Sequence, residues 1–320
     1  MNPNQRQQIE YPTAYLGTLA AGAAVALIPA QQELTDTDVV AWLTQSETKL
    51  LITDSALLDL ATSSAHQASI PHLMTLDHTE YKPYVSLDEL LAHGQPDANI
   101  FYLTSESSAA AHDAFLNRTS GSTGVVKNVL TSHAHFIATM EGTLGTIPAS
   151  TDPARDVWLS PLSLGFFINA KLHMGLNILL GIPVVLICDG HTLDETTVDV
   201  VARHRVTFLF ITPPVAARLA RADLHSVDVC SVKWLLTAGA PIHENLRRAV
   251  SRQFGGVPLD LEWGTSETML IAVQTNAESS RRDGSSGTLI NGMQTKVIST
   301  GHNSEAELGA GQAGEIHVRN

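Results

Sequence analysis

The sequence has 320 residues, of which 44% are hydrophobic and 16% are charged, and its formal net charge is −13. This apolar content can fill a sizeable core, which excludes a wholly disordered chain. The acidic balance argues against general nucleic-acid binding, although a local cationic pocket for one nucleotide is compatible with it. Two cysteines, Cys188 and Cys230, exclude a disulfide scaffold and a CxxC metal site, and we interpret both as buried thiols in a reducing compartment.

Apolar periodicity alternates between helix and strand patterns along most of the chain. In chain order it predicts a helix over 15–23, a strand over 24–28, a helix that Thr35 begins, and strands over 49–53 and 156–159. It then predicts a helix over 170–180, strands over 183–187 and 206–211, a helix over 214–220, a strand over 232–236 and a helix over 243–254. Strands that alternate with helices indicate a largely parallel sheet covered on both faces, so we predict an α/β fold.

The end of the chain has a different pattern. After Gly284, short strands over 295–299 and 315–319 are separated by glycine-rich turns, which predicts an antiparallel or barrel-like, β-rich appendage. We therefore divide the chain into an α/β core over 1–283 and the start of a β-rich subdomain over 284–320. Polar stretches at 105–113 and 276–287 are interpreted as loops. The apolar run over 16–30 is too short to span a membrane.

One stretch, FLNRTSGSTGVVKNVLTSH over 115–133, has the composition of an anion-binding loop. Its two glycines allow backbone N–H groups to converge, its hydroxyls add donors, and its lysine adds a positive charge. The spacing does not fit a Walker A motif, and a flexible Ser/Gly loop is the alternative interpretation. The candidate polyphosphate-binding residues are Thr119, Ser120, Gly121, Ser122, Thr123, Gly124 and Lys127.

The segment TSGSTGxxK resembles the phosphate-binding signature of the adenylate-forming superfamily, which includes acyl-CoA synthetases, luciferases and peptide-synthetase adenylation domains. Four further landmarks follow in the superfamily's order: LLTAGAP over 235–241, LEWGTSET over 261–268, GSSG over 284–287 and GEIHVR over 314–319. Within that superfamily the sequence is similar to fungal 4-coumarate–CoA-ligase-like acyl-CoA ligases of secondary metabolism, including those of host-selective toxin pathways. The resemblance extends over nearly the whole chain.

The resemblance implies an ATP-dependent ligase that forms acyl-AMP from a carboxylic acid and then transfers the acyl group to coenzyme A. The loop over 119–124 and Lys127 would bind the β- and γ-phosphates of ATP, and an aromatic ring at the tyrosine position of the superfamily would stack on the purine. A hydroxyl would meet the α-phosphate and a carboxylate would hold magnesium, which favours oxygen ligands. The implied residues are Gly239, Ala240 and Pro241 along the adenine, Trp263 as the stacking ring, Ser266 at the α-phosphate, Gly264 and Thr265 as further cofactor-binding residues, and Glu267 for the metal; Lys127, Ser266 and Glu267 would be catalytic.

The acid-binding pocket is implied at PLSLGFFIN over 161–169, where relatives often carry an aromatic residue followed by histidine. Leu164, Phe166 and Phe167 would form an apolar wall there, with Gly239 beside it, which suits a hydrophobic acid. An ordinary core helix is an equally good interpretation of these residues. Lys171, on the same expected helix, could meet a carboxylate, but a single lysine on a helix is more often solvated surface, which is the interpretation that we adopt.

Departures from the superfamily pattern leave other functions open. Val126 and Asn128 replace the usual proline and glycine of the phosphate loop, and we expect the opening strands and the small C-terminal lid domain, with its catalytic lysine, to be absent. A truncated protein that binds nucleotide or acyl ligand without turnover is one alternative, and a recruited fold with an ATP-independent reaction is another. A partner chain would then supply the missing domain. We expect a cytoplasmic protein, because the last three residues are no peroxisomal signal.

Overall fold

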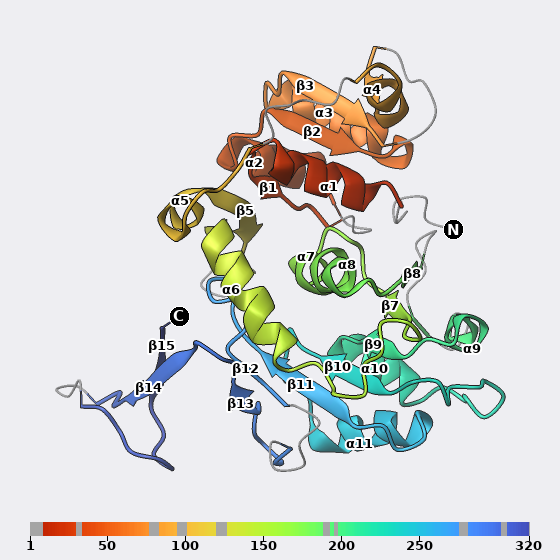
Figure 1. Cartoon of the computed structure of the whole chain (residues 1–320), viewed down its shortest axis with the longest axis vertical. Coiled ribbons are helices and arrows are strands. Elements are labelled where there is room, and N and C mark those ends of the chain that lie inside the picture. Colours follow the sequence, from red (N-terminus) through yellow and green to blue (C-terminus); the bar gives the residue numbers. More distant parts are fainter. Residues whose placement is uncertain are drawn as a thin grey trace.

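The computed structural model describes residues 9–29, 34–76, 83–94, 101–119, 127–187, 193–194, 198–274, 281–301 and 306–319. It has the α/β architecture that the alternating periodicity predicts (Figure 1). Its helices are α1 (Tyr11–Ala20), α2 (Asp36–Gln45), α3 (Leu58–Gln67), α4 (Leu87–His93), α5 (Glu106–Ala111), α6 (His133–Leu144), α7 (Phe167–Lys171), α8 (Asn177–Leu180), α9 (Asp199–His204), α10 (Pro213–Leu219) and α11 (Glu244–Gln253), with a short 3₁₀ helix η1 (Ser55–Leu57) and a π-helical turn η2 (Leu172–Leu176) between α7 and α8.

A seven-stranded sheet forms the larger half of the molecule, in the order β13-β12-β11-β10-β9-β7-β8. The five strands from β11 to β8 run parallel, and β12 and β13 are antiparallel additions at one edge. The strands are β7 (Trp158–Ser160), β8 (Val184–Leu186), β9 (Phe208–Phe210), β10 (Trp234–Thr237), β11 (Leu259–Trp263), β12 (Ala272–Val273) and β13 (Thr288–Leu289).

Alternating side chains of these strands build two separate cores, because successive residues of a strand point to opposite faces. Leu159, Leu209, Leu235 and Leu259 face one core together with residues of α9, α10 and α11. Trp158, Phe208 and Trp234, which precede the first three of these leucines, face the other core together with residues of α6 and η2. In that second core the rings of Trp158, Phe208 and Trp234 contact one another in tilted and edge-to-face arrangements, with centroids 4.3–6.3 Å apart. Both faces of the sheet are therefore covered, as the apolar strand sequences predict.

The N-terminal part of the chain forms two smaller sheets, and each has three strands. One has the order β1-β5-β6, with β1 parallel to β5 and β6 antiparallel to it. The other has the order β2-β3-β4 and is entirely parallel. Helix α2 begins at a capping box in which the Thr35 and Asp38 side chains and main chains bond reciprocally, as the Thr/Asp cluster predicts. The strands are β1 (Val25–Ala26), β2 (Leu50–Thr53), β3 (His72–Thr75), β4 (Val85–Ser86), β5 (Asp113–Arg118) and β6 (Asn128–Ser132).

The C-terminal segment forms an antiparallel ladder of β14 (Gln294–Ile298) and β15 (Glu315–Arg319), which lies apart from the larger sheet in Figure 1. The antiparallel prediction for this segment is confirmed, while the boundary at residue 284 stays a prediction. The loop expected at 105–113 is wrong, because α5 occupies most of it and the Ser105 side chain caps that helix by accepting from Ser108 N–H. Among the described residues, no helix is long and apolar enough to cross a membrane.

Candidate functional site

The candidate site lies at the carboxyl edge of the seven-stranded sheet, where the loops after β7, β10 and β11 emerge. Thr237 is paired with Leu261 in the parallel ladder of β10 and β11. Continuing that register by two residues brings Gly239 and Trp263 to the same level. The loops of the GAP and GTSET segments are therefore neighbours, at the edge where ligands of parallel sheets characteristically bind.

The turn after β11 is held by its own hydroxyl groups. The Thr265 and Thr268 Oγ1 atoms lie 3.0 Å apart, and each also accepts a hydrogen bond from the other residue's main-chain N–H, at 3.2 and 3.3 Å. Gly264 is required here, because a Cβ atom at this position would lie 1.9 Å from the Met269 carbonyl oxygen. These contacts fix the main chain on both sides of Ser266 and Glu267. The hydroxyl of Thr265, predicted to meet ATP, is bonded within the turn.

The Glu267 side chain is exposed at the tip of this turn, and none of the described residues pairs with its carboxylate. Magnesium in phosphate-transfer sites is commonly held by one or two carboxylates together with the oxygens of the phosphates. A free, solvent-accessible carboxylate on a rigid turn suits that ligand set. The exposed carboxylate is compatible with the magnesium role predicted for Glu267, which stays a prediction.

The adenine-side residues lie in the open. Gly239, Ala240 and Pro241 are exposed, and Gly239 adopts φ +91°, a conformation that other residues rarely take. The Trp263 ring is half-buried and packs on one side against the second core. The protein therefore supports one side of the Trp263 ring, which is the arrangement that a ring needs in order to stack on a purine.

In the sequence, the phosphate-binding candidates fall between β5 and β6, which pair as antiparallel strands. Thr119 N–H donates to the Lys127 carbonyl at 2.9 Å, and Lys127 N–H donates to Thr119 Oγ1 at 3.1 Å, so the two residues close the base of the loop. The Lys127 side chain is exposed. Ser120, Gly121, Ser122, Thr123 and Gly124 lie outside the described residues.

Helix α2 contacts the base of this hairpin, which the sequence did not indicate. The Arg118 guanidinium lies 4.7 Å from the centroid of the Trp42 ring, in a cation–π contact. On the opposite strand, Asn128 Nδ2 donates to the Gln45 carbonyl at the end of α2 at 3.1 Å. Asn128 is one of the two departures from the superfamily pattern, and here it ties the loop base to α2.

Lys171 is not solvated surface, so that expectation is wrong. Its ammonium group is buried and paired with the Glu262 carboxylate, with side-chain exposures of 3% and 5%. The reason is that the lysine side chain extends from α7 to Glu262 of β11, so it points at the sheet instead of at water. Glu262 immediately precedes Trp263, so this ion pair joins the predicted acid-binding helix to the adenine-side strand. A charged residue inside an otherwise buried strand was the signal that could have identified it.

A buried polar network extends from the same helix to the loop after β7. Asn169 Nδ2 donates to the Ser163 carbonyl at 2.7 Å and to the Leu162 carbonyl at 3.4 Å, which orients its Oδ1 toward Ser160 and His173. His173 Nδ1, 2.7 Å from that oxygen, therefore carries the proton. Burial lowers the pKa of His173 to about 3, so its ring stays neutral. The network holds the loop that carries Leu164.

The three predicted wall residues occupy different environments. Leu164 is buried and belongs, with Tyr15 and Phe115, to the core beneath β1 and β5. Phe167 is half-buried and contacts the Phe115 ring at 5.3 Å between centroids. Phe166 is half-buried at the start of α7. The core interpretation thus applies to Leu164 and Phe167, while their role toward an acid remains a prediction.

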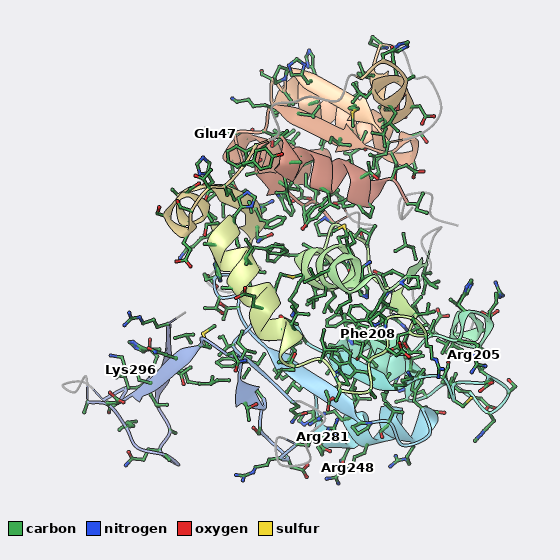
Figure 2. The ribbon with its side chains drawn as sticks, in the orientation of Figure 1. Glu47, Arg205, Phe208, Arg248, Arg281 and Lys296 are labelled. Carbon is green, nitrogen blue, oxygen red and sulfur yellow. The ribbon has the colours of Figure 1, made fainter. Side chains whose placement is uncertain are left out.

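A second charged cluster braces the far end of β11. Arg281 Nε and a terminal nitrogen donate to the two Asp260 carboxylate oxygens at 2.7 and 3.0 Å, in a bidentate pair. Burial raises the pKa of Asp260, although Arg281 opposes that rise. Figure 2 labels Arg281 and Arg248 in the region of α11 and β11. Arg248 in turn donates to Asp283 at 2.6 Å, so this cluster anchors the segment that leads to the GSSG landmark.

Cys230 is exposed, which corrects the expectation of two buried thiols. It lies in the turn before β10, and a hydrogen bond to the neighbouring Asp228 carboxylate raises the pKa of its thiol. A raised pKa disfavours the nucleophilic thiolate. Cys188 lies outside the described residues.

A sequence model of the family described as "AMP-binding enzyme" matches residues 6–320. The chain is 26% identical over 316 residues to 4-coumarate–CoA ligase 3 of Arabidopsis thaliana, an alignment that covers 97% of this chain and 54% of the relative. It is 27% identical over 294 residues to 3-hydroxybenzoate–CoA ligase of Aromatoleum sp. (strain CIB), which covers 90% and 53%. The chain thus spans about half the length of the curated relatives it matches.

The fold also matches solved structures. A long-chain-fatty-acid–CoA ligase from Archaeoglobus fulgidus superposes with a TM-score of 0.83 at 18% sequence identity, covering 98% of this chain and 61% of that one. At this identity the likeness concerns the fold. It supports the mixed α/β assignment, with helices on both faces of parallel strands and a small β-rich segment at the C-terminal end.

Proposed function

Because the chain belongs to the AMP-binding enzyme family, we propose that it activates a hydrophobic carboxylic acid with ATP and passes the acyl group to the thiol of coenzyme A. The observation that supports this function best is the pairing of two loops at the carboxyl edge of one parallel sheet. One loop exposes Gly239–Pro241, and the other carries the exposed Glu267 carboxylate four residues after the half-buried Trp263. Fungal secondary metabolism and a cytosolic location are parts of the same proposal, carried by the sequence resemblance and the composition.

The proposed chemistry has two steps. A carboxylate oxygen of the acid attacks the α-phosphorus of ATP, and the bond from that phosphorus to the bridging oxygen of the β-phosphate breaks, which releases pyrophosphate and leaves acyl-AMP. The sulfur of coenzyme A then attacks the acyl carbon; AMP leaves with the carbon–oxygen electron pair, and the thiol proton goes to solvent. The first step brings two anions together, so fixed cations and hydrogen-bond donors supply most of its catalysis.

The proposed roles of the described residues come from the resemblance, and their placement supports them. Lys127, at the base of the hairpin, would neutralise the outer phosphates, and the Ser266 hydroxyl would donate to the α-phosphate. Glu267 would hold magnesium, which when bound neutralises phosphate charge. Trp263 and the exposed GAP loop would bind the adenine. The apolar wall at Phe166 suits an aromatic or aliphatic acid.

The test is ATP–pyrophosphate exchange with a panel of aromatic and medium- to long-chain acids, together with a calorimetric ATP titration of the same preparation. We expect acid-dependent exchange that Glu267→Ala reduces at least about 100-fold, as for the loss of one preorganised charge. Glu106→Ala, an exposed carboxylate at the start of α5, is the matched control and should leave exchange unchanged.

Other outcomes would replace the proposal. ATP binding without exchange would indicate a nucleotide-binding protein that needs a partner chain for turnover. Product formed from the acid without ATP would indicate a recruited fold with another reaction. Neither binding nor exchange, from folded protein, would contradict the ligase function.

A further inference from the structure

A buried helical segment carries three polar side chains that the proposed chemistry does not use. Asn169 and Lys171 lie on α7 and His173 lies on the π-helical turn η2 that follows it, and all three are no more than 3% exposed. Turns of this kind are rare and occur frequently at functional sites. Asn169 and His173 bond to each other, whereas Lys171 reaches across to the large sheet.

The Lys171–Glu262 ion pair spans the gap between α7 and the large sheet just before the two loops of the candidate site begin. Thr237 pairs with Leu261 in the parallel ladder, so Glu262 is level with the residue that precedes Gly239. The pair therefore lies at the carboxyl edge of the sheet, on the side that α7 covers.

Two parts of the proposed ligase meet at this pair. The segment implied to bind the acid, 161–169, ends two residues before Lys171, and Glu262 belongs to the strand that leads to the turn with Ser266. An acid whose carboxylate meets the α-phosphate beside Ser266 would extend its tail from that turn toward α7. The tail would then meet the ion pair.

The interior next to the pair is filled by side chains. Leu172 and Leu176 of η2 are fully buried in the second core together with Met140 of α6. A Cβ atom at Gly175 would lie 2.7 Å from the Ala170 carbonyl oxygen and 2.9 Å from Met140 Cε, so η2 and α6 are in close contact. A tail that passed the pair would have to displace this packed interior.

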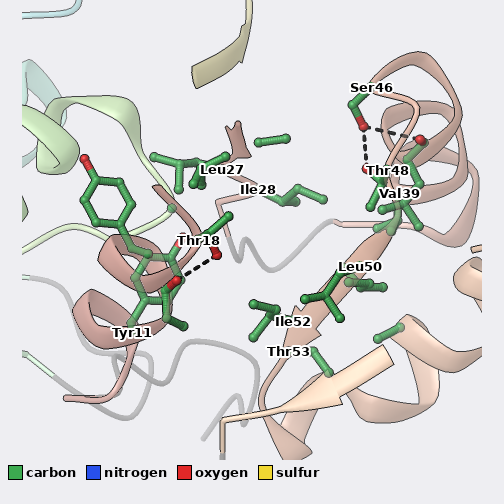
Figure 3. Close-up of a pocket in the computed structure, with 18 of the residues that line it drawn as sticks. Tyr11, Thr18, Leu27, Ile28, Val39, Ser46, Thr48, Leu50, Ile52 and Thr53 are labelled. Atoms are coloured by element: carbon green, nitrogen blue, oxygen red, sulfur yellow. Dashed lines mark hydrogen bonds between the residues drawn. The ribbon is translucent and has the colours of Figure 1, made fainter. Parts of the chain in front are cut away.

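The apolar cavity of about 500 Å³ between the two three-stranded sheets is a different space. Figure 3 shows Leu27 on one side of it and Leu50 on another. Lys171 and Glu262 are not among the residues that line it, whereas Ala61 is. Variants at the ion pair and at Ala61 therefore probe the two spaces separately.

We propose that the Lys171–Glu262 pair limits the length of the acid, and that the substrate is a compact acid with one aromatic ring or a short aliphatic chain. This inference rests on the proposed function, because it concerns the acid of that same site. Apolar residues of similar volume would stabilise the fold as well as a buried ion pair does. The pair is, however, a barrier to an apolar tail, because a tail that separated it would leave two desolvated charges without partners.

The test compares how tightly the whole protein binds hexanoate and decanoate. The calorimetric titrations contain an ATP analogue with a methylene bridge between the α- and β-phosphates, so acid binding is measured without turnover. We expect the wild type to bind hexanoate more tightly than decanoate. In Lys171→Met/Glu262→Met the side chains are flexible and uncharged, so they can yield to a tail. The affinity for decanoate relative to hexanoate should then rise at least about tenfold, since each methylene newly buried contributes roughly fourfold.

Three further variants make the result specific to the pair. Lys171→Met/Glu262→Ala removes more volume and should shift the ratio of the two affinities further, which keeps the test decisive if two methionine side chains fill the space. Asp199→Met/Arg203→Met removes an exposed ion pair as the matched control and should leave the ratio unchanged. Ala61→Leu, which places methyl groups in the separate cavity, should also leave it unchanged.

A pair with a purely structural role would affect both acids alike, so the ratio of their affinities separates the two roles. An unchanged ratio in both folded pair variants, tighter binding of decanoate than of hexanoate by the wild type, a ratio altered by Ala61→Leu, or no binding of either acid would each overturn the proposal. Length-selective binding without ATP–pyrophosphate exchange would contradict the ligase function and leave this inference standing. Exchange without length selectivity would do the reverse.

Discussion

Strands β9 and β10 of the large sheet are hydrogen-bonded along both edges and covered on both faces, whereas β1 and β2 each pair along one edge and border a cavity of about 500 Å³. Both regions consist of short apolar strands and amphipathic helices. The large sheet is completed by neighbours, and its buried charges are paired, as with Lys171 and Glu262. In both regions the hydrophobic pattern along the chain determines the individual strands and helices. Whether the interior between them is filled depends on how many strands pair side by side.

The largest expected effect is at the buried ion pair of the closed region. Lys171→Met should lower the free energy of unfolding by about 3–5 kcal/mol, because it leaves the Glu262 carboxylate buried and unpaired. Urea denaturation measures the loss. Replacing both residues with methionine should restore most of the stability. Arg203→Met, which removes an exposed pair with Asp199, should cost no more than about 1 kcal/mol. Equal losses for the two single variants would contradict the assignment of a tightly closed interior.

The pH dependence of stability should sharpen the same contrast. His173 has a pKa of about 3 in the folded protein, against an ordinary value of 6.5, because burial disfavours its charged form. Below pH 6.5 the unfolded chain binds a proton that the folded protein does not, so this contribution to stability falls as the pH falls from 6.5 toward 3. The expected slope is about 1.4 kcal/mol per pH unit.

The measurement is urea denaturation of the wild type and of His173→Gln between pH 6 and pH 4. In His173→Gln, the free energy of unfolding should depend less steeply on pH, by about 1.4 kcal/mol per pH unit. His66→Gln, on the exposed side of α3, should show the same pH dependence as the wild type. An unchanged slope in His173→Gln would show that another group takes up the proton.

Enlarging a side chain should have opposite outcomes in the two regions. Ala216, on α10, is fully buried in a packed core, and Ala216→Leu should destabilise the protein by about 1–3 kcal/mol through overpacking. Ala61, on α3, borders the cavity, so Ala61→Leu should be neutral or stabilising by about 1 kcal/mol because its methyl groups enter empty apolar space. Urea denaturation of both variants tests this, and a loss at Ala61 as large as that at Ala216 would mean that the cavity is closed in solution.

The smallest effect concerns the contact between the open region and the phosphate-loop hairpin. Trp42→Leu should lower the free energy of unfolding by about 0.5–1 kcal/mol beyond the change in buried area, because the cation–π contact with Arg118 is lost. Trp42→Phe retains an aromatic face and should lose less. Thermal unfolding of the two variants side by side gives the comparison, and equal losses would assign the effect to packing alone.

The sequence was most informative where the pattern was strictly local. Strands such as β8 and β9 lie within the predicted ranges, because short apolar runs between turn residues leave few alternatives. Helix α2 begins where its capping residues place it. The GSSG and GTSET motifs were recognisable as resemblances, since residues such as Gly264 are fixed by a close main-chain contact that other side chains cannot satisfy.

Contacts between distant segments were decided by the tertiary structure. The sequence indicated a solvated Lys171 because nothing within α7 shows that β11 lies across it, 91 residues further along the chain. The link from Asn128 to Gln45 and the exposure of Cys230 depend on packing in the same way. The residues alone therefore determined the α/β class, the family motifs and most element positions, because these follow from periodicity and main-chain sterics. Which charges are buried, which edges are free and where the cavity lies followed only from how the layers meet.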